Sequence, residues 1–500
     1  MIAKARVLIA SLLAIAALAG CGSGGPSGAS PARLAPANTL FYLELTLRPQ
    51  GAQHDAAESA LTKVIGHSPD AAIQRGVTRL FRRAGLSYSN DIAPWLGQRI
   101  GIVLTSVSSP PNIGLIAPTN DPASALATLH RLARHASLRS ATYRGLHYQI
   151  GTSNGTPLAL GIVSRAAVVA TPAAFTSIVD ASRGRGLIAS PAYRAAVRAM
   201  PAGPLVRGYA DLSALRSRLR LLLSALPNTG AGTQVLPALL NRLNGAVAFS
   251  LTVRRDAFVA DARSTVSHPA TGSDVSGLPG QSWLALAGGT GSQRTVSLLR
   301  ALRGNPAFAA LLSRFRARTG LDLIRDVLPG LGKVELSVQG TSPLTLGAGL
   351  EATPTDAAAG RRLLAGIRRV ASRSSSLMVS GNDRNFTISK RGSLLPRVLV
   401  TESGSKLVAT FDEAVSQLRT PVLRLSDNPR FVTARRQLPA GSRVSAFLDF
   451  RSLAQLLQGL RSFTANPPSS NVLAILHRFD YLIVGSNPSS GQSRIVLALR

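Results

Sequence analysis

The chain of 500 residues is 45% apolar, 5% aromatic and 16% charged, and its formal net charge is +33 at pH 7. This apolar fraction suits a folded protein with sizeable cores and excludes a disordered chain. Nearly all the positive charge is arginine, spread along the sequence instead of clustered with aromatic residues. That distribution disfavours nucleic acid as a partner and favours the interpretation that the arginines keep the protein soluble. The alternative is weak attraction to anionic surfaces of a cell envelope.

The N-terminus has the features of a secretory signal. Two basic residues precede an apolar run over 7–19, which is shorter than the roughly 20 residues that span a bilayer. The run ends in LAGC at 18–21, which is similar to the bacterial lipobox, where the cysteine thiol receives a diacylglyceryl group. We therefore predict a signal peptide over 1–20, lipidation of Cys21, and a location on the outer face of the cytoplasmic membrane or in the cell envelope.

The residues after this signal indicate a tether. Cys21 is the only cysteine, so the chain forms no intramolecular disulfide. The Gly, Ser and Pro content of 21–33 resists packing and predicts a flexible connection between the lipid and the folded part.

The first half of the chain shows strands joined by short turns, with helices between groups of strands. Asp121 followed by Pro122 predicts an N-cap and a proline at the first position of a helix. Strands and hairpins are predicted at 39–47, 99–107, 112–118, 141–151, 157–171 and 245–265, and further helices at Thr171, Ser190 and Leu212. This order is typical of an α+β fold, mainly antiparallel sheet with helices packed on one face.

The second half repeats the first. Residues 85–97 and 320–332 are identical at six of thirteen positions, and 201–212 is similar to 439–450. We therefore predict two tandem copies of one module. The predicted organisation is a signal peptide (1–20), a tether (21–33), module 1 (34–270), a linker (271–277) and module 2 (278–500).

Residues that both copies share are predicted to serve the shared fold. Gly97 and Gly332 are expected to make turns that Pro94 and Pro329 stiffen. Asp211 and Asp449 each follow a strand and precede a helix, so we expect both to cap helix N-termini.

Motifs that suggest catalysis stand in the wrong context. GTSNG fits G-x-S-x-G, but strand-like residues follow Ser153, where a nucleophile elbow needs a helix. The SGSK at 403–406 and SDN at 426–428 are similar to penicillin-recognising serine enzymes, but no Lys-Thr-Gly completes the set. His130 and His135 diverge around a helix and cannot chelate together. The sequence therefore predicts no catalytic residue, no metal site, no cofactor and no enzymatic activity, and it leaves the ligand-binding residues unknown.

The segment 355–373 is predicted to form an amphipathic helix. Its arginines would face solvent, and a phosphate-binding stripe is the alternative role for them. The arginines are Arg361, Arg362, Arg368 and Arg369, and the opposite face holds Leu363, Leu364, Ile367 and Val370.

The lipobox and tether, followed by LAPANTLFYLELTLRPQG and DIAPWLGQRIGIVL, resemble bacterial secreted proteins with the domain of unknown function 3352. The resemblance implies an envelope location and no established activity, and it brings no functional residues with it.

The function expected from these features is that of a non-enzymatic binding or scaffold lipoprotein. Its partner is the membrane, through the N-terminal lipid, with protein partners unknown. Two alternatives remain open: a carrier of a lipid or other hydrophobic molecule, and a hydrolase of envelope polymers.

Overall fold

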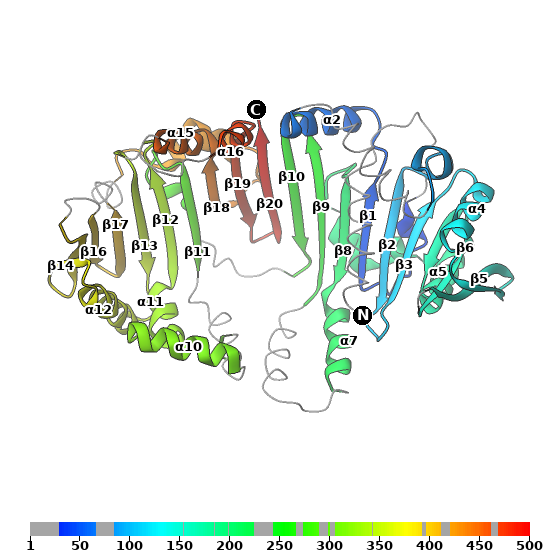
Figure 1. Ribbon diagram of the computed structural model, residues 1–500, viewed down its shortest axis with the longest axis horizontal. Coiled ribbons are helices and arrows are strands. Elements are labelled where there is room, and N and C mark those ends of the chain that lie inside the picture. The colour runs from blue at the N-terminus through cyan, green and yellow to red at the C-terminus, as the bar shows by residue number, and fades with distance from the viewer. Residues whose placement is uncertain are drawn as a thin grey trace. The chain divides into compact units, whose positions relative to one another are not determined.

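The computed structural model shows antiparallel sheets with helices (Figure 1). The predicted signal peptide, Cys21 and most of the predicted tether lie outside the described residues. Among the described residues no helix is both long enough and apolar enough to cross a membrane. The structure describes residues 30–66, 85–153, 155–184, 186–198, 200–224, 244–266, 274–289, 299–300, 306–342, 344–392, 397–411, 421–461 and 469–500.

The chain divides into two compact units. In its described part, unit 1 comprises 30–224 and 244–266, and unit 2 comprises 274–500.

The described part of unit 1 is built around ten strands. Their order is β10-β9-β8-β1-β2-β3-β7-β6-β5-β4, and each named pair of neighbours is antiparallel. The elements are η1 (Pro31–Arg33), β1 (Phe41–Thr46), α2 (Ala52–Ile65), η2 (Tyr88–Ile92), β2 (Arg99–Ser106), β3 (Asn112–Pro118), α4 (Pro122–Leu132), β4 (Ser137–Tyr143), β5 (Leu146–Ser153), β6 (Thr156–Val163), β7 (Ala166–Ala170), α5 (Pro172–Arg183), η3 (Leu187–Ala189), α6 (Pro191–Val197), β8 (Val206–Asp211), α7 (Leu212–Ser224), β9 (Ala246–Arg254) and β10 (Ala257–Ser264).

Within its described residues, unit 2 also has ten strands, in the order β20-β19-β18-β11-β12-β13-β17-β16-β15-β14, again antiparallel throughout. This is the order of unit 1 with each strand number raised by ten. The elements are η4 (Val275–Gly277), β11 (Leu284–Gly289), α10 (Pro306–Thr319), η5 (Leu323–Val327), α11 (Leu328–Leu331), β12 (Lys333–Gln339), β13 (Gly347–Thr353), α12 (Ala357–Arg373), β14 (Leu377–Gly381), β15 (Asn385–Lys390), β16 (Arg397–Ser403), β17 (Lys406–Phe411), η6 (Leu425–Asp427), α14 (Pro429–Arg435), β18 (Arg443–Asp449), α15 (Phe450–Leu460), α16 (Ser470–Leu476), β19 (Phe479–Asn487) and β20 (Gln492–Leu499).

Helix starts follow the local sequence closely. The side chain of Asp121 accepts hydrogen bonds from the amides of Ala123 and Ser124, both at 3.1 Å, and Pro122 is the first helical residue of α4. Ser190 and Asn428 cap α6 and α14 in the same way, each ahead of a proline. These caps satisfy amides that have no acceptor inside the helix.

The prediction that helices cover only one face of the sheet is wrong. In unit 1, Phe175 and Ile178 of α5 pack with Tyr42 on one face, while Leu129 of α4 packs with Leu45 on the other. In unit 2, α12 packs against one face, and Phe431 of α14 meets Phe447 of β18 on the opposite face, with ring centroids 5.3 Å apart. The strands bury both faces because they are apolar at successive positions, as in the AAVVA of β7.

The described part of each unit includes residues that the sequence analysis placed in the tether or the linker. Pro31–Arg33 form a 3-10 helix with Ala32 fully buried, although this segment belongs to the predicted tether. Likewise Val275–Gly277, in the predicted linker, form a 3-10 helix that Asp274 caps and that buries Val275. Proline, glycine and serine suggested flexibility, but here they form short turns that pack on a sheet.

Candidate functional site

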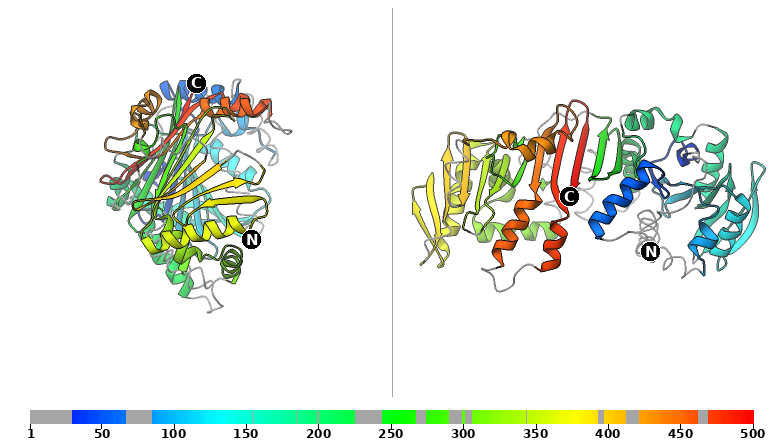
Figure 2. Two further views of the ribbon diagram at one scale, coloured as in Figure 1. Left: turned by 90° about the vertical axis from the view of Figure 1, so that its left-hand side faces the viewer. Right: turned by 90° about the horizontal axis from the view of Figure 1, so that it is seen from above.

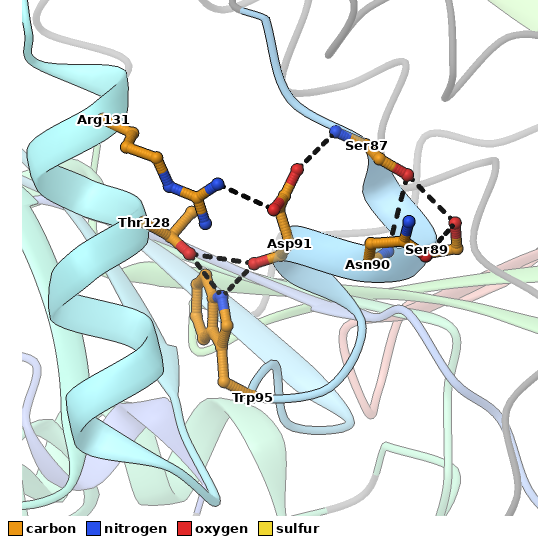
Figure 3. Close-up of polar contacts among 7 residues, drawn as sticks. All are labelled: Ser87, Ser89, Asn90, Asp91, Trp95, Thr128 and Arg131. Carbon is orange, nitrogen blue, oxygen red and sulfur yellow. Dashed lines mark hydrogen bonds and ion pairs between the residues drawn. The ribbon is translucent and has the colours of Figure 1, made fainter.

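An aspartate in each unit joins the turn before a strand to the helix that packs over it. In unit 1, Asp91 of η2 accepts a hydrogen bond from the amide of Ser87 at 2.7 Å and one from Arg131 Nη1 of α4 at 2.8 Å (Figure 3). The backbone oxygen of Asp91 accepts from Trp95 Nε1 at 2.7 Å and from Thr128 Oγ1 at 2.9 Å. We call this arrangement the aspartate clasp.

Asp326 forms the aspartate clasp of unit 2, and it is more deeply buried, at 2% exposed. It accepts from the amide of Asp322 at 2.9 Å, from Arg325 Nε at 3.1 Å and from Arg362 Nε of α12 at 2.7 Å. Counted from the caps Asp121 and Asp356, Arg362 stands one helical turn before the position of Arg131. The two units thus hold an equivalent carboxylate with arginines from different turns of the matching helix.

Hydrogen bonds keep both clasp carboxylates ionised. The amide of Ser87, followed by the guanidinium of Arg131, lowers the pKa of Asp91. Burial acts to raise the pKa of Asp326, but the amide of Asp322 and the guanidinium groups of Arg325 and Arg362 together lower it below its usual value. A carboxylate with a lowered pKa and cationic partners already in place is a poor proton acceptor, so the clasps are suited to holding the fold together.

The predicted turn residues lie next to the clasps. The amide of Gly97 donates to the backbone oxygen of Pro118 at 2.8 Å, and a Cβ on Gly97 would lie 2.8 Å from that oxygen. Gly332 has φ +34°, and a Cβ there would lie only 2.0 Å from the oxygen of Thr353. Pro329 lies in the first turn of α11, and Pro94 follows η2. Both glycines therefore allow a close approach of backbone that a side chain would block.

The two predicted cap residues stand at the starts of α7 and α15. Asp211 accepts from the amide of Ala214 at 2.8 Å. Asp449 accepts from the amide of Arg451 at 2.9 Å and also lies 3.4 Å from Arg430 Nη1. Asp449 thus has an ion pair in addition to its cap.

We expect Asp211→Ala to lower the unfolding free energy of unit 1 by about 1 kcal/mol, because the first turn of α7 loses its acceptor. Asp211→Asn should preserve nearly all the stability, since the amide oxygen can accept the same bond. Urea unfolding followed by the fluorescence of Trp95, in a Trp283→Phe background, measures this for unit 1. Equal losses for alanine and asparagine would contradict the capping role.

Polar residues that the two units do not share are the stronger candidates for a special role. Glu44 of β1 is 4% exposed, and its Oε2 accepts from Ser30 Oγ and from Tyr42 Oη, both at 2.7 Å. Its Oε1 lies 3.4 Å from Arg99 Nη1. Burial, and then the charge of Glu44, raises the pKa of Tyr42 well above its usual value, so this phenol remains a donor. The cluster binds Ser30, the first residue that the structure describes.

Unit 2 places the corresponding carboxylate on the neighbouring strand. The β1–β2 pair of unit 1 corresponds to the β11–β12 pair of unit 2. Thr46 pairs with Arg99 in the first and Gly289 pairs with Lys333 in the second, so Gly289 is equivalent to Thr46. Two residues earlier, Ala287 is therefore equivalent to Glu44. Ala287 pairs in turn with Glu335, whose Oε1 lies 2.8 Å from Lys333 Nζ.

Glu335 also stands opposite Glu351 of β13, which forms an ion pair with Lys406. Sequence reasoning missed this carboxylate pair, because Glu335 and Glu351 meet only through the β12–β13 register. Each of the two carboxylates has its own lysine, so the cluster is charge-balanced.

The rejected motifs lie in hairpins and caps. Ser153 is the last residue of β5 and pairs with Thr156, and Ser403 pairs with Lys406 across the β16–β17 hairpin. Asn428, the last residue of the SDN motif, caps α14. His135 Nε2 accepts from Arg134 Nε at 3.0 Å. Within the described residues no group of three or more His, Cys, Asp or Glu side chains is arranged to hold a metal ion.

A family model described as "Protein of unknown function (DUF3352)" matches residues 2–499. The chain belongs to this family. The predicted membership of this family is thereby confirmed. No curated protein matches this DUF3352 protein.

Two solved structures have some likeness to this DUF3352 protein. The structure titled "Structure of crystal form IV of TP0453" matches with 13% identity and a TM-score of 0.23, over 47% of this chain and 81% of the other. The structure titled "Structure of crystal form I of TP0453" matches with 11% identity and a TM-score of 0.26, over 49% and 82%. A likeness at these TM-scores carries no argument about fold or function.

Proposed function

We propose that this DUF3352 protein is a lipid-anchored envelope protein made of two copies of one module, which serves as a binding or scaffold protein without enzymatic activity. The observation that supports this most is how the shared polar residues are used. The clasp carboxylates Asp91 and Asp326 and the caps Asp211 and Asp449 all bond to backbone amides or arginines of their own unit. Such residues maintain a repeated framework.

The strand orders support the duplication. Ten strands in one unit and ten in the other follow the same order, with the clasp ahead of β2 in one unit and ahead of β12 in the other. Two unrelated domains would have no reason to share both the order and the place of the clasp. An experimental structure with a different strand order in either unit would end the duplication argument.

The first described residue lies close in sequence to the proposed lipid anchor. Ser30 is bound by Glu44 and lies nine residues after Cys21. Nine residues extend to at most about 30 Å, so a lipid on Cys21 would keep unit 1 close to the bilayer surface.

Lipidation is tested with Cys21→Ser in the native bacterial background. We expect wild-type protein to incorporate radiolabelled fatty acid and to partition into the detergent phase, because the thiol of Cys21 forms the thioether to the lipid. Cys21→Ser should lose both properties completely. Ser27→Ala, in the same segment, is the control and should label like wild type. Undiminished labelling of Cys21→Ser would refute the anchor.

A further inference from the structure

The helices on one side of unit 2 carry a strong excess of positive charge. The described elements α10, η5 and α12, with the caps Asp322 and Asp356, hold nine arginines and three aspartates. Figure 1 shows α10 and α12 near one end of the strands of unit 2, with α15 and α16 near the other. In the left view of Figure 2, the yellow helix α12 lies alongside the yellow strands. The charge is therefore gathered on one layer of the unit.

The buried faces of these two helices orient the arginines outward. Phe315 of α10 and Leu363, Leu364 and Ile367 of α12 pack in one apolar cluster against the sheet. The arginines stand mostly on the remaining faces.

Six of these arginines are exposed and have no carboxylate within salt-bridge distance among the described residues. We call this set the arginine layer: Arg314, Arg316, Arg318, Arg361, Arg369 and Arg373. The other three are held by aspartates, since Arg325 and Arg362 bind Asp326 and Arg368 binds Asp383.

Exposed apolar side chains lie on the same helices. Leu311 is 58% exposed one turn before Arg314, and Val370 is 39% exposed next to Arg369. The sequence pattern predicts Val370 on the buried face, but the structure leaves it partly in solvent. Arginine beside exposed aliphatic groups is the composition of surfaces that lie in a membrane interface.

Unit 1 shares this feature only in part. Counted from the helix caps Asp356 and Asp121, the positions of Arg361 and Arg373 are occupied by Leu126 and Leu138, whereas Arg369 corresponds to Arg134. In unit 2 the clasp uses Arg325 and Arg362, so Arg361 and Arg373 take no part in it.

We propose that the arginine layer of unit 2 binds the anionic phospholipid headgroups of the bilayer that carries the lipid anchor. Guanidinium groups bind phosphate through two parallel hydrogen bonds and are weakly hydrated, so they desolvate readily at a headgroup surface. A soluble polyanion would satisfy the arginines alone, whereas a bilayer also accepts Leu311 and Val370. The inference deepens the proposed function and rests on the membrane location.

The test uses residues 22–500 without a lipid, a chain that contains every described residue, and sucrose-loaded vesicles. Its result does not depend on whether Cys21 is acylated, so it can fail separately from the lipid anchor. We expect binding to phosphatidylcholine vesicles that contain about one third phosphatidylglycerol and no binding to pure phosphatidylcholine. The triple variant Arg361→Gln, Arg369→Gln, Arg373→Gln should lower vesicle affinity by about 100-fold, since each arginine contributes about fivefold.

The matched control removes the same charge from unit 1. Arg139, Arg194 and Arg255 are exposed, and their replacement by glutamine should weaken binding far less. An equal loss in this control would show that only the net charge matters and would overturn the assignment. Circular dichroism and urea unfolding of both triple variants establish that the fold is intact.

Leu311→Ser separates a bilayer from a soluble polyanion. We expect it to weaken vesicle binding by about fivefold, because the bilayer loses an apolar contact. If this variant bound vesicles as well as the wild type, and equimolar long-chain polyphosphate abolished that binding, the ligand would be a phosphate polymer. That result would overturn the assignment to a bilayer.

Discussion

Gly332→Ala is expected to destabilise unit 2 by about 4 kcal/mol. The new methyl group would lie 2.0 Å from the oxygen of Thr353 and 2.9 Å from the amide nitrogen of Thr355, and both are backbone atoms. A left-handed residue with a side chain costs about 1–2 kcal/mol, and forced backbone movement costs about 1–3 kcal/mol more. The variant should therefore unfold at much lower urea concentrations than the wild type.

Each unit contains one tryptophan, Trp95 in unit 1 and Trp283 in unit 2, so stability can be measured for one unit at a time. Trp283 is 8% exposed and donates to the oxygen of Gly340 at 2.8 Å. Its emission should shift strongly when unit 2 unfolds. In a Trp95→Phe background, urea unfolding of Gly332→Ala then reports unit 2 alone.

Gly404→Ala is the control for backbone conformation without a clash. Gly404 has φ +60°, and a Cβ at this position would have no neighbouring atom within 4 Å, so the expected loss is only about 1–2 kcal/mol. Gly97→Ala, measured by the fluorescence of Trp95, should lower the stability of unit 1 by an intermediate amount. Its Cβ would lie 2.8 Å from the oxygen of Pro118, but Gly97 has no positive φ. Equal losses at Gly332 and Gly404 would contradict the close approach described at Thr353.

Asp326→Ala is expected to cost unit 2 about 3 kcal/mol at pH 7. The variant removes the acceptor for the amide of Asp322 and for the guanidinium groups of Arg325 and Arg362. The loss is limited because both arginine side chains are partly exposed, at 67% and 42%, and can bind water instead. Asp91→Ala should cost unit 1 less, because the Asp91 side chain is 20% exposed and that of Asp326 only 4%.

The same carboxylate predicts a dependence of stability on pH. The pKa of Asp326 is lowered in the fold, so the unfolded chain binds more protons than the folded chain in the acid range. Its contribution is present above the unfolded pKa of about 4 and is lost as the pH falls through the folded value. The urea midpoint of unit 2 should therefore fall between about pH 5 and pH 3. Asp326→Asn should give a flatter curve, and an unchanged slope would show that other carboxylates are responsible.

Local sequence signals predicted most of the framework. The Asp-Pro pair placed the start of α4, and the strands predicted at 99–107 and 112–118 correspond to β2 and β3 within one residue. These elements follow from capping and alternation, which act over a few residues. The repeated stretch 85–97 contains Asp91, which is identical in both copies. The repeat alone does not predict its ion pair, because the partner Arg131 lies 40 residues away in the sequence.

Pairing across strands was the part that sequence patterns could not supply. Glu335 and Glu351 face each other because β12 and β13 pair in one particular register. The sequence analysis predicted no turn between these two strands, so it could not predict that register. The covered second face was missed for a related reason. The apolar AAVVA of β7 indicates burial on both sides, but which helices provide it depends on tertiary packing.

The placement of Glu44 and Glu335 bears on how two like units fold within one chain. Glu44 lies on β1 and pairs with Gly101 of β2, while in unit 2 the acid lies on the other strand, as Glu335 opposite Ala287 of β11. If β1 of the nascent chain paired with β12 in the matching register, Glu44 would face the half-buried Glu335, and two like charges would lie side by side. The opposite exchange, β11 with β2, would leave Arg99 without its acid. A strand that enters the wrong unit thus meets an electrostatic mismatch, which favours separate folding of the two halves during synthesis.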